Sequence, residues 1–380
     1  MNGNRLTLFS LFGFAIRIDL SWIIILFLVI WSLGMGVFPN YFEGLPTAVY
    51  WWMGVIGALG LFFSIISHEL SHSLVARKFG LVIKGITLFI FGGVAEMEEE
   101  PPSARAEFYM ALAGPVSSLI LGMFFYGLFL IGGRIEWPRP VLGILWYLGT
   151  INFVLAGFNL IPAFPLDGGR ILRSALWSWK GSLTWATRVS SRTGTYFGIF
   201  LIALGILNFL RGALISGIWL FLIGMFIQNA SQSSLQRTLM TKALEGEKVR
   251  RFMKPDPMTV PSNLTIAEFV EDYVYRYHYK MFPVVDQDKL IGCANTRDIK
   301  ELPREKWSEH ELKDLIKNCS LDNTISPEAD ATQALSRISK SGNSRLLVVE
   351  DGKLVGVITL KDLLNFFSLK MELEGEDRRR

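Results

Sequence analysis

Two histidines with three residues between them, and a glutamate directly after the first, occur in the segment Phe63–Arg77. On a helix, His68 and His72 lie one turn apart on one face, so both imidazoles can bind one metal ion. Glu69 then reaches a metal-bound water rather than the metal. Zinc lowers the pKa of such a water to about 7, and the carboxylate takes its proton and later passes one to a leaving amine. The pattern indicates a zinc peptidase; the alternative is a pair of packing histidines.

A catalytic zinc has three protein ligands and one open position. We expect Asp167 as the third ligand, because it follows the segment Gly157–Pro165, in which two prolines break a helix. The alternatives for Asp167 are a helix cap at Gly168 or an ion pair with Arg170. Asn159, inside the same apolar stretch, could donate a hydrogen bond to a substrate carbonyl, or bond a neighbouring helix instead.

These residues fall in the apolar part of a segregated chain. The 380 residues are 51% apolar, yet long apolar runs dominate only up to about residue 230. About 20 apolar residues suffice to cross a bilayer. Ionisable groups at the end of such a helix are costly and usually functional. We therefore expect a polytopic α-helical membrane domain over residues 1–230, with spans at 20–37, 48–74, 108–131, 141–161, 196–210 and 213–227.

The lysine and arginine distribution predicts the orientation of these spans. One side of the expected topology collects most of the basic residues, whereas the other has only Arg134, Arg139 and Arg211. Both termini are therefore expected in the cytoplasm of a prokaryotic-type, multi-pass cell membrane protein. We read no removable signal peptide at the N-terminus.

Two segments alternate like strands instead of spanning a membrane. Leu6–Ile18 and Leu81–Met97 are expected to form a small β-sheet at the membrane face. The Gly92–Gly93 pair would make a turn or allow a close approach of the backbone.

Three motifs follow one another along residues 1–230: His68–His72, Ala113–Gly114–Pro115, and Asn159–Gly169. Together, in this order and spacing, they resemble the site-2 protease family of intramembrane zinc metalloproteases. The resemblance implies a core of spans two to four, with His68, His72 and Asp167 as zinc ligands. It also implies Glu69 as general base, Asn159 near the scissile carbonyl, and another protein's transmembrane segment as substrate.

Cleavage of a transmembrane segment requires local unwinding, because a helix hides its peptide bonds. Adding the unwound segment as a strand at a sheet edge would satisfy its backbone. We expect the strand around Phe89–Val94 to offer that edge.

After a polar linker at 231–248, one pattern of strands and helices occurs twice, with a period of roughly 65 residues. The two units, 249–307 and 308–370, precede a charged tail at 371–380. They resemble a tandem pair of cystathionine-β-synthase-type (CBS) domains, which commonly bind adenine nucleotides between the modules. The expected fold is thus a membrane domain followed by a soluble α/β CBS module.

The CBS resemblance implies a nucleotide site where a threonine or serine precedes an aspartate by three positions, at the turn from a strand to a helix. Thr359 and Asp362 match this pattern, whereas Asn295 and Asp298 depart from it in the polar partner. A carboxylate can accept both ribose hydroxyls while a helix N-terminus faces phosphate. The alternative is an empty module that forms a homodimer through the CBS domains.

Other features narrow the function. The net charge is only +4, without a basic tract that interleaves aromatic residues, so no nucleic-acid partner is expected. Cys293 and Cys319 are expected to be reduced core thiols. We therefore expect an intramembrane endopeptidase with one Zn²⁺ per chain, regulated by ATP, ADP or AMP. The alternatives are a CBS-gated transporter or channel and, least favoured, a scaffold without activity.

Overall fold

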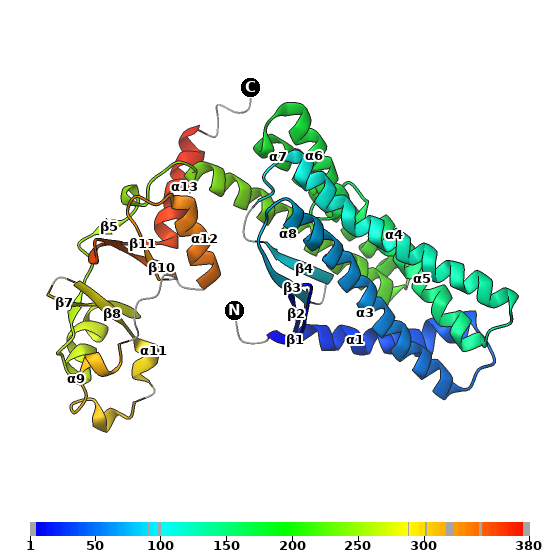
Figure 1. Ribbon diagram of the computed structural model, residues 1–380, viewed down its shortest axis with the longest axis horizontal. Coiled ribbons are helices and arrows are strands. Elements are labelled where there is room, and N and C mark those ends of the chain that lie inside the picture. The colour runs from blue at the N-terminus through cyan, green and yellow to red at the C-terminus, as the bar shows by residue number, and fades with distance from the viewer. Residues whose placement is uncertain are drawn as a thin grey trace. The chain divides into compact units, whose positions relative to one another are not determined.

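The computed structural model describes residues 5–89, 92–97, 100–287, 289–300, 302–316, 323–341 and 344–374. The chain divides into two compact units, Met1–Thr238 and Leu239–Arg380. The long helices belong to the first unit, and the second unit is a sheet flanked by shorter helices (Figure 1).

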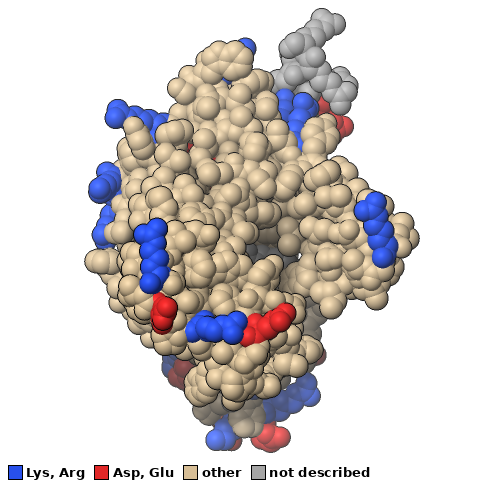
Figure 2. Space-filling model, turned by 90° about the vertical axis from the view of Figure 1, so that its right-hand side faces the viewer, with Lys and Arg blue, Asp and Glu red and all other residues tan. Residues whose placement is uncertain are grey.

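Membrane-spanning helices dominate the first unit. Side chains such as Phe27, Ile120 and Phe200 are 63%, 56% and 55% exposed, and many other large apolar side chains of these helices are exposed with them, as expected of a lipid-facing surface. Figure 2 shows one face of the molecule on which uncharged residues predominate. Among the described residues, six helical segments are long and apolar enough to span: Ser21–Tyr41, Thr47–Lys78, Ala104–Arg134, Arg139–Asn159, Leu183–Leu210 and Leu214–Leu244.

The first of these segments consists of α1 (Ser21–Ser32), a π-helical turn (Leu33–Val37) and α2 (Phe38–Tyr41). The next three are α3 (Thr47–Lys78), α4 (Ala104–Arg134) and α5 (Arg139–Asn159), and the last two are α7 (Leu183–Leu210) and α8 (Leu214–Leu244). A short amphipathic helix, α6 (Asp167–Lys180), lies between α5 and α7 and ends at Gly181, where φ is +67°.

Helices α7 and α8 extend well beyond the expected apolar runs 196–210 and 213–227. A span that is predicted from a run of apolar residues ends at the first polar residues. In α7, however, the buried residues Thr187, Ser190 and Ser191 continue the helix. The two backbones are in close contact: a Cβ on Gly205 would lie 2.7 Å from the carbonyl oxygen of Gly217.

A sheet with the order β1-β2-β3-β4 lies beside α3. The inner pair β2–β3 is parallel and the outer pairs are antiparallel. Ile16, Ile86 and Leu88 are buried with Ile66 of α3, which places the sheet next to the segment that carries the histidines. The expected small sheet, called the membrane-face sheet after its predicted place, is therefore present, with strands Arg5–Leu11, Phe14–Asp19, Ile83–Phe89 and Gly92–Met97.

The second unit contains two repeats, each with its own apolar core. Its sheet has the order β6-β7-β8-β11-β10-β9, with β5 paired to β11. The halves meet where β8 pairs with β11 at Lys289 and Lys353. Its strands are β5 Lys254–Pro255, β6 Val260–Pro261, β7 Met281–Asp286, β8 Lys289–Asn295, β9 Thr324–Ile325, β10 Arg345–Glu350 and β11 Lys353–Thr359. Its helices are α9 Ile266–Glu268, α10 Tyr275–Tyr277, α11 Thr296–Ile299, α12 Ala331–Ser341 and α13 Leu360–Glu374.

The stretch 231–248, expected as a polar linker, is helical as far as Leu244. Polarity by itself does not end a helix, and Gln232, Gln236, Arg237 and Lys242 in this stretch are good helix formers. Met240 and Leu244 share one face and pack into the core around Val249 and Ile325. Cys293 is buried, as expected, whereas Cys319 lies outside the described residues.

Candidate metal centre and nucleotide site

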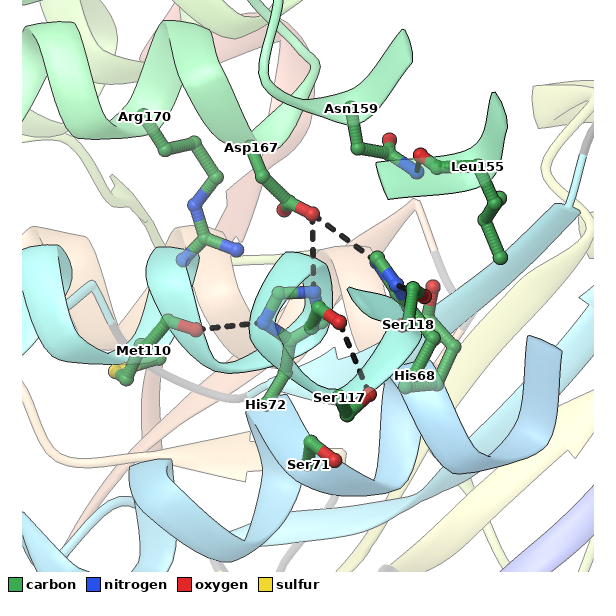
Figure 3. A network of polar contacts seen from close by, with 12 residues as sticks. His68, Ser71, His72, Met110, Ser117, Ser118, Leu155, Asn159, Asp167 and Arg170 are labelled. Carbon is green, nitrogen blue, oxygen red and sulfur yellow. Dashed lines mark hydrogen bonds and ion pairs between the residues drawn. The ribbon is translucent and has the colours of Figure 1, made fainter. Parts of the chain in front are cut away.

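Three side chains distant in sequence converge next to the sheet. The ligand atoms of His68, His72 and Asp167 all lie within 4.8 Å of one another, and all three residues are buried. The Oδ2 atom of Asp167 lies 3.1 Å from Nε2 of His68 and 3.2 Å from Nε2 of His72. Figure 3 shows both imidazoles directed at this oxygen.

The second nitrogen of each imidazole contacts α4. Nδ1 of His68 lies 2.9 Å from Oγ of Ser118, and Nδ1 of His72 lies 2.6 Å from the carbonyl oxygen of Met110. A carbonyl only accepts, so His72 donates from Nδ1 and leaves Nε2 as the ligand atom. Neither Ser118 nor Met110 can be recognised from the sequence, because a contact with a backbone carbonyl or a lone serine has no spacing signature.

Gly114 of the Ala113–Gly114–Pro115 motif supplies the room for the two imidazoles. A Cβ atom at this position would overlap Nε2 of both His68 and His72. Only glycine permits this closeness between the α4 backbone and the rings. The two imidazoles therefore require the glycine of this motif on steric grounds.

Asp167 is the first residue of α6, directly after the nonhelical segment 160–166. A Cβ on Gly168 would overlap the carbonyl of Leu160, so the chain folds back tightly at this point. The two alternatives for Asp167 are not what the structure has. The N-cap position belongs to Leu166, and Arg170 pairs with Glu107 at 3.8 Å.

Glu69 and Asn159 lie near the three ligand candidates in different ways. Glu69 is half-buried on α3, and a Cβ on Gly93 of β4 would overlap its Cγ, so the β4 backbone lies on Glu69. This is the close approach expected of the Gly92–Gly93 pair. Asn159 donates from Nδ2 to the carbonyl oxygen of Leu155 at 3.0 Å, within its own helix (Figure 3).

The three converging side chains fit a zinc ion by their chemistry. Imidazole nitrogen and carboxylate oxygen are common zinc ligands, and a set of three leaves one position open. The carboxylate offsets part of the ion's charge in a buried setting, where an unpaired charge is costly.

In the second unit, the expected nucleotide residues lie at helix N-termini. The backbone N–H of Thr359 donates to Oδ2 of Asp362 at 3.0 Å, and the N–H of Asp362 donates to Oγ1 of Thr359 at 3.2 Å. Nζ of Lys254 lies 3.3 Å from Oδ1 of Asp362, a neighbour that the sequence analysis missed. In the first repeat, Asn295 donates to Asp298 at 3.2 Å, so the asparagine keeps the contact that a threonine would make.

Comparisons with known proteins agree with both halves of this description. The model of peptidase family M50 matches residues 56–136 and 133–204, and the CBS domain model matches residues 249–305 and 313–369. Rip3 of Mycobacterium tuberculosis is 34% identical over 353 residues, covering 92% of this chain and 90% of Rip3. Zinc metalloprotease MJ0392 of Methanocaldococcus jannaschii is 30% identical over 369 residues, covering 97% of each chain.

The solved structure of a site-2 protease from Methanocaldococcus jannaschii is 29% identical, with a TM-score of 0.43. It covers 60% of this chain and 94% of that chain.

The chain belongs to peptidase family M50: it is a zinc metalloprotease of the site-2 protease type that carries a tandem pair of CBS domains. It is a multi-pass membrane protein. Membership of this family favours the protease over the transporter or channel.

Proposed function

We propose that this protease cuts the transmembrane segments of membrane-anchored proteins at a zinc ion held by His68, His72 and Asp167, under the control of adenine nucleotide at the CBS pair. The observation that carries the proposal is the convergence of three buried ligand atoms within 4.8 Å. Their partners Ser118 and Met110 orient the imidazoles for this task.

A zinc ion bound there would polarise the scissile carbonyl and lower the pKa of a bound water. Glu69 accepts the proton of the attacking water and delivers it to the leaving amine. Its position supports this role, because it follows His68 directly and lies under the β4 backbone. Asn159 stabilises the oxyanion: its amide has two N–H donors, and the bond to Leu155 uses one.

The substrate segment pairs as a strand with the edge of the membrane-face sheet. The expected edge around Phe89–Val94 falls on the end of β3 and the start of β4, with residues 90 and 91 outside the described ones. In the described order, β4 is an outer strand. An outer strand offers backbone N–H and C=O groups to an unwound segment, and Gly93 brings that edge to Glu69.

Adenine nucleotide binds the second unit at Thr359 and Asp362, with a weaker half-site at Asn295 and Asp298. The N-terminus of α13 faces the phosphates, and Lys254 adds a positive charge beside Asp362. The basic residues on one side of the spans support a cytoplasmic location for both termini and for this unit. The CBS pair also offers a surface for a homodimer.

Cleavage by a Glu69→Gln variant tests the proposal. The full-length Glu69→Gln variant in liposomes should cleave a panel of single-span proteins at least about 10²-fold more slowly than the wild-type protein does. Zinc content should stay at the wild-type value, because Glu69 is not a ligand. Cleavage at a comparable rate would refute the role of Glu69 and the proposed reaction with it.

A further inference from the structure

The first unit contains a buried ion pair outside the metal centre. Glu107, in the first turn of α4, is 0% exposed, and Arg173 of α6 is 3% exposed. Arg173 donates from Nε to Oε1 of Glu107 at 2.7 Å, and from a terminal nitrogen to the same oxygen. Nε of Arg170 lies 3.8 Å from it. Two guanidinium groups of α6 thus converge on one carboxylate of α4.

On α6, the two arginines follow the metal-ligand candidate at regular helical spacing. Asp167, Arg170 and Arg173 succeed one another every three residues in a helix of 14 residues. The same rigid segment therefore carries both the carboxylate that faces the histidines and the cations that face Glu107. Arg173 also lies over the ring of Phe164, in the turn just before Asp167, at 5.2 Å from the ring centre.

On α4, the same face that carries Glu107 contacts both histidines. Glu107, Met110, Gly114 and Ser118 recur at spacings of three and four residues, which places them on one side of the helix. Met110 and Ser118 contact the two Nδ1 atoms, and Gly114 packs against the two Nε2 atoms. One helix face thus positions the imidazoles directly and reaches α6 through Glu107.

We propose that the Glu107–Arg173 ion pair is a positioning element that sets α6, and with it the Asp167 carboxylate, at the distance from the histidines that zinc requires. A charged pair with two donors from one guanidinium fixes direction as well as distance, which apolar packing does not. The inference rests on the proposed assignment of His68, His72 and Asp167 as zinc ligands.

The environment of Glu107 makes this pair sensitive to substitution. Its second oxygen, Oε2, is buried and has no hydrogen-bond partner among the described residues. The carboxylate is held through Oε1, where the arginines meet. Replacing Glu107 by glutamine keeps the shape and removes the buried charge that both arginines contact, which leaves Arg173 its longer contact with the partly exposed Glu100 at 3.5 Å.

The test compares zinc binding by full-length wild-type, Glu107→Gln and Arg173→Lys proteins in detergent, by competition with a chelator of known affinity. We expect Glu107→Gln to bind zinc about 10- to 100-fold more weakly, the usual effect of removing an interaction behind a metal ligand. Arg173→Lys keeps the charge and should lose less. In the cobalt-substituted protein, the absorption bands should shift more in Glu107→Gln than in Arg173→Lys. Excess zinc should restore the kcat of both variants and leave KM unchanged.

Asn152→Ala is the matched control. Asn152 is buried and donates to Ser64 at 2.9 Å and to Leu148 at 2.8 Å, so these two hydrogen bonds join α3 to α5 and use no atom of the Glu107–Arg173 pair. This variant should lower the melting temperature but leave zinc affinity unchanged.

Two results would overturn the positioning role: wild-type zinc affinity and cobalt spectrum in both ion-pair variants, or an equal loss of affinity in Asn152→Ala. Arg173→Lys decides the question if Glu107→Gln does not fold. A wild-type protein that binds no zinc would instead refute the proposed metal centre, so the two failures are distinguishable.

Discussion

The candidate metal centre of the first unit and the Thr359–Asp362 pair of the second differ in how far apart their residues lie in the sequence. His68 and Asp167 are 99 residues apart and meet only because α3, α4 and α6 pack together. Thr359 and Asp362 are three residues apart and form a helix cap by themselves. A long-range cluster of buried ligand atoms has few structural explanations, whereas a local Thr–Asp contact also stabilises a helix N-terminus without any ligand.

The two sites also differ in whether a ligand is needed to satisfy their polar groups. The metal centre brings together buried polar groups that would be costly without a bound ion or a proton between them. The CBS pair satisfies its own hydrogen bonds at α11 and α13. Substitutions should therefore separate ligand binding from stability more sharply in the first unit than in the second.

The largest effect is expected from Asp167→Asn. The amide removes the charge that offsets zinc, so both zinc content and cleavage should fall to background, as measured by metal analysis and a transmembrane-substrate assay. Glu69→Gln is the comparison, with cleavage lost and zinc retained. Full zinc occupancy in Asp167→Asn would exclude this carboxylate as a ligand.

Asn159→Ala is expected to lower kcat by about 10²- to 10³-fold with little change in KM, as for the loss of an oxyanion donor. Steady-state cleavage kinetics provide the measurement. If the amide serves only the carbonyl of Leu155, kcat will stay near the wild-type value and only the melting temperature will change.

Gly114→Ala should weaken zinc binding by about 10- to 100-fold, because a Cβ there displaces both imidazoles. Gly127→Ala is the matched control in the same helix, since a Cβ at Gly127 meets nothing within 4 Å. That variant should bind zinc normally. Equal zinc affinity in the two variants, by chelator competition, would contradict the steric role of Gly114.

The smallest effect is expected in the second unit. Thr359→Ala removes the cap of α13 and should lower the free energy of unfolding by about 1 kcal/mol. It should also weaken nucleotide binding, as measured by calorimetry with ATP and AMP on the full-length protein. Thr265→Ala removes a comparable capping box in the first repeat and should lower stability alone. Identical nucleotide titrations for both variants would leave Thr359 with only its capping role.

Much of the fold, and the convergence of His68, His72 and Asp167, could be predicted from the sequence, because the signals are local. Apolar runs indicate spans, alternation indicates the membrane-face strands, and a four-residue spacing places His68 and His72 on one helix face. Asp167 was predicted from broken helix geometry. The helical continuation of α8 to Leu244 differs from the expected linker, because the polar composition of this stretch does not distinguish a linker from a solvent-exposed helix.

The contacts behind the ligands could not be predicted. Glu107 and Arg173 are 66 residues apart, and neither belongs to a motif. The partner of His72 is a backbone carbonyl, which every residue has. Such contacts depend on how α4 packs against α3 and α6, and that packing is a property of the folded chain.

X-ray absorption at the zinc edge of the full-length protein tests the central claim most directly. We expect one zinc per chain, with two imidazole nitrogens at about 2.0–2.1 Å and oxygen ligands at about 2.0–2.2 Å. The same measurement on His72→Ala should show the imidazole signal reduced or the zinc lost. A zinc shell without imidazole, or a protein that holds no zinc, would contradict the account.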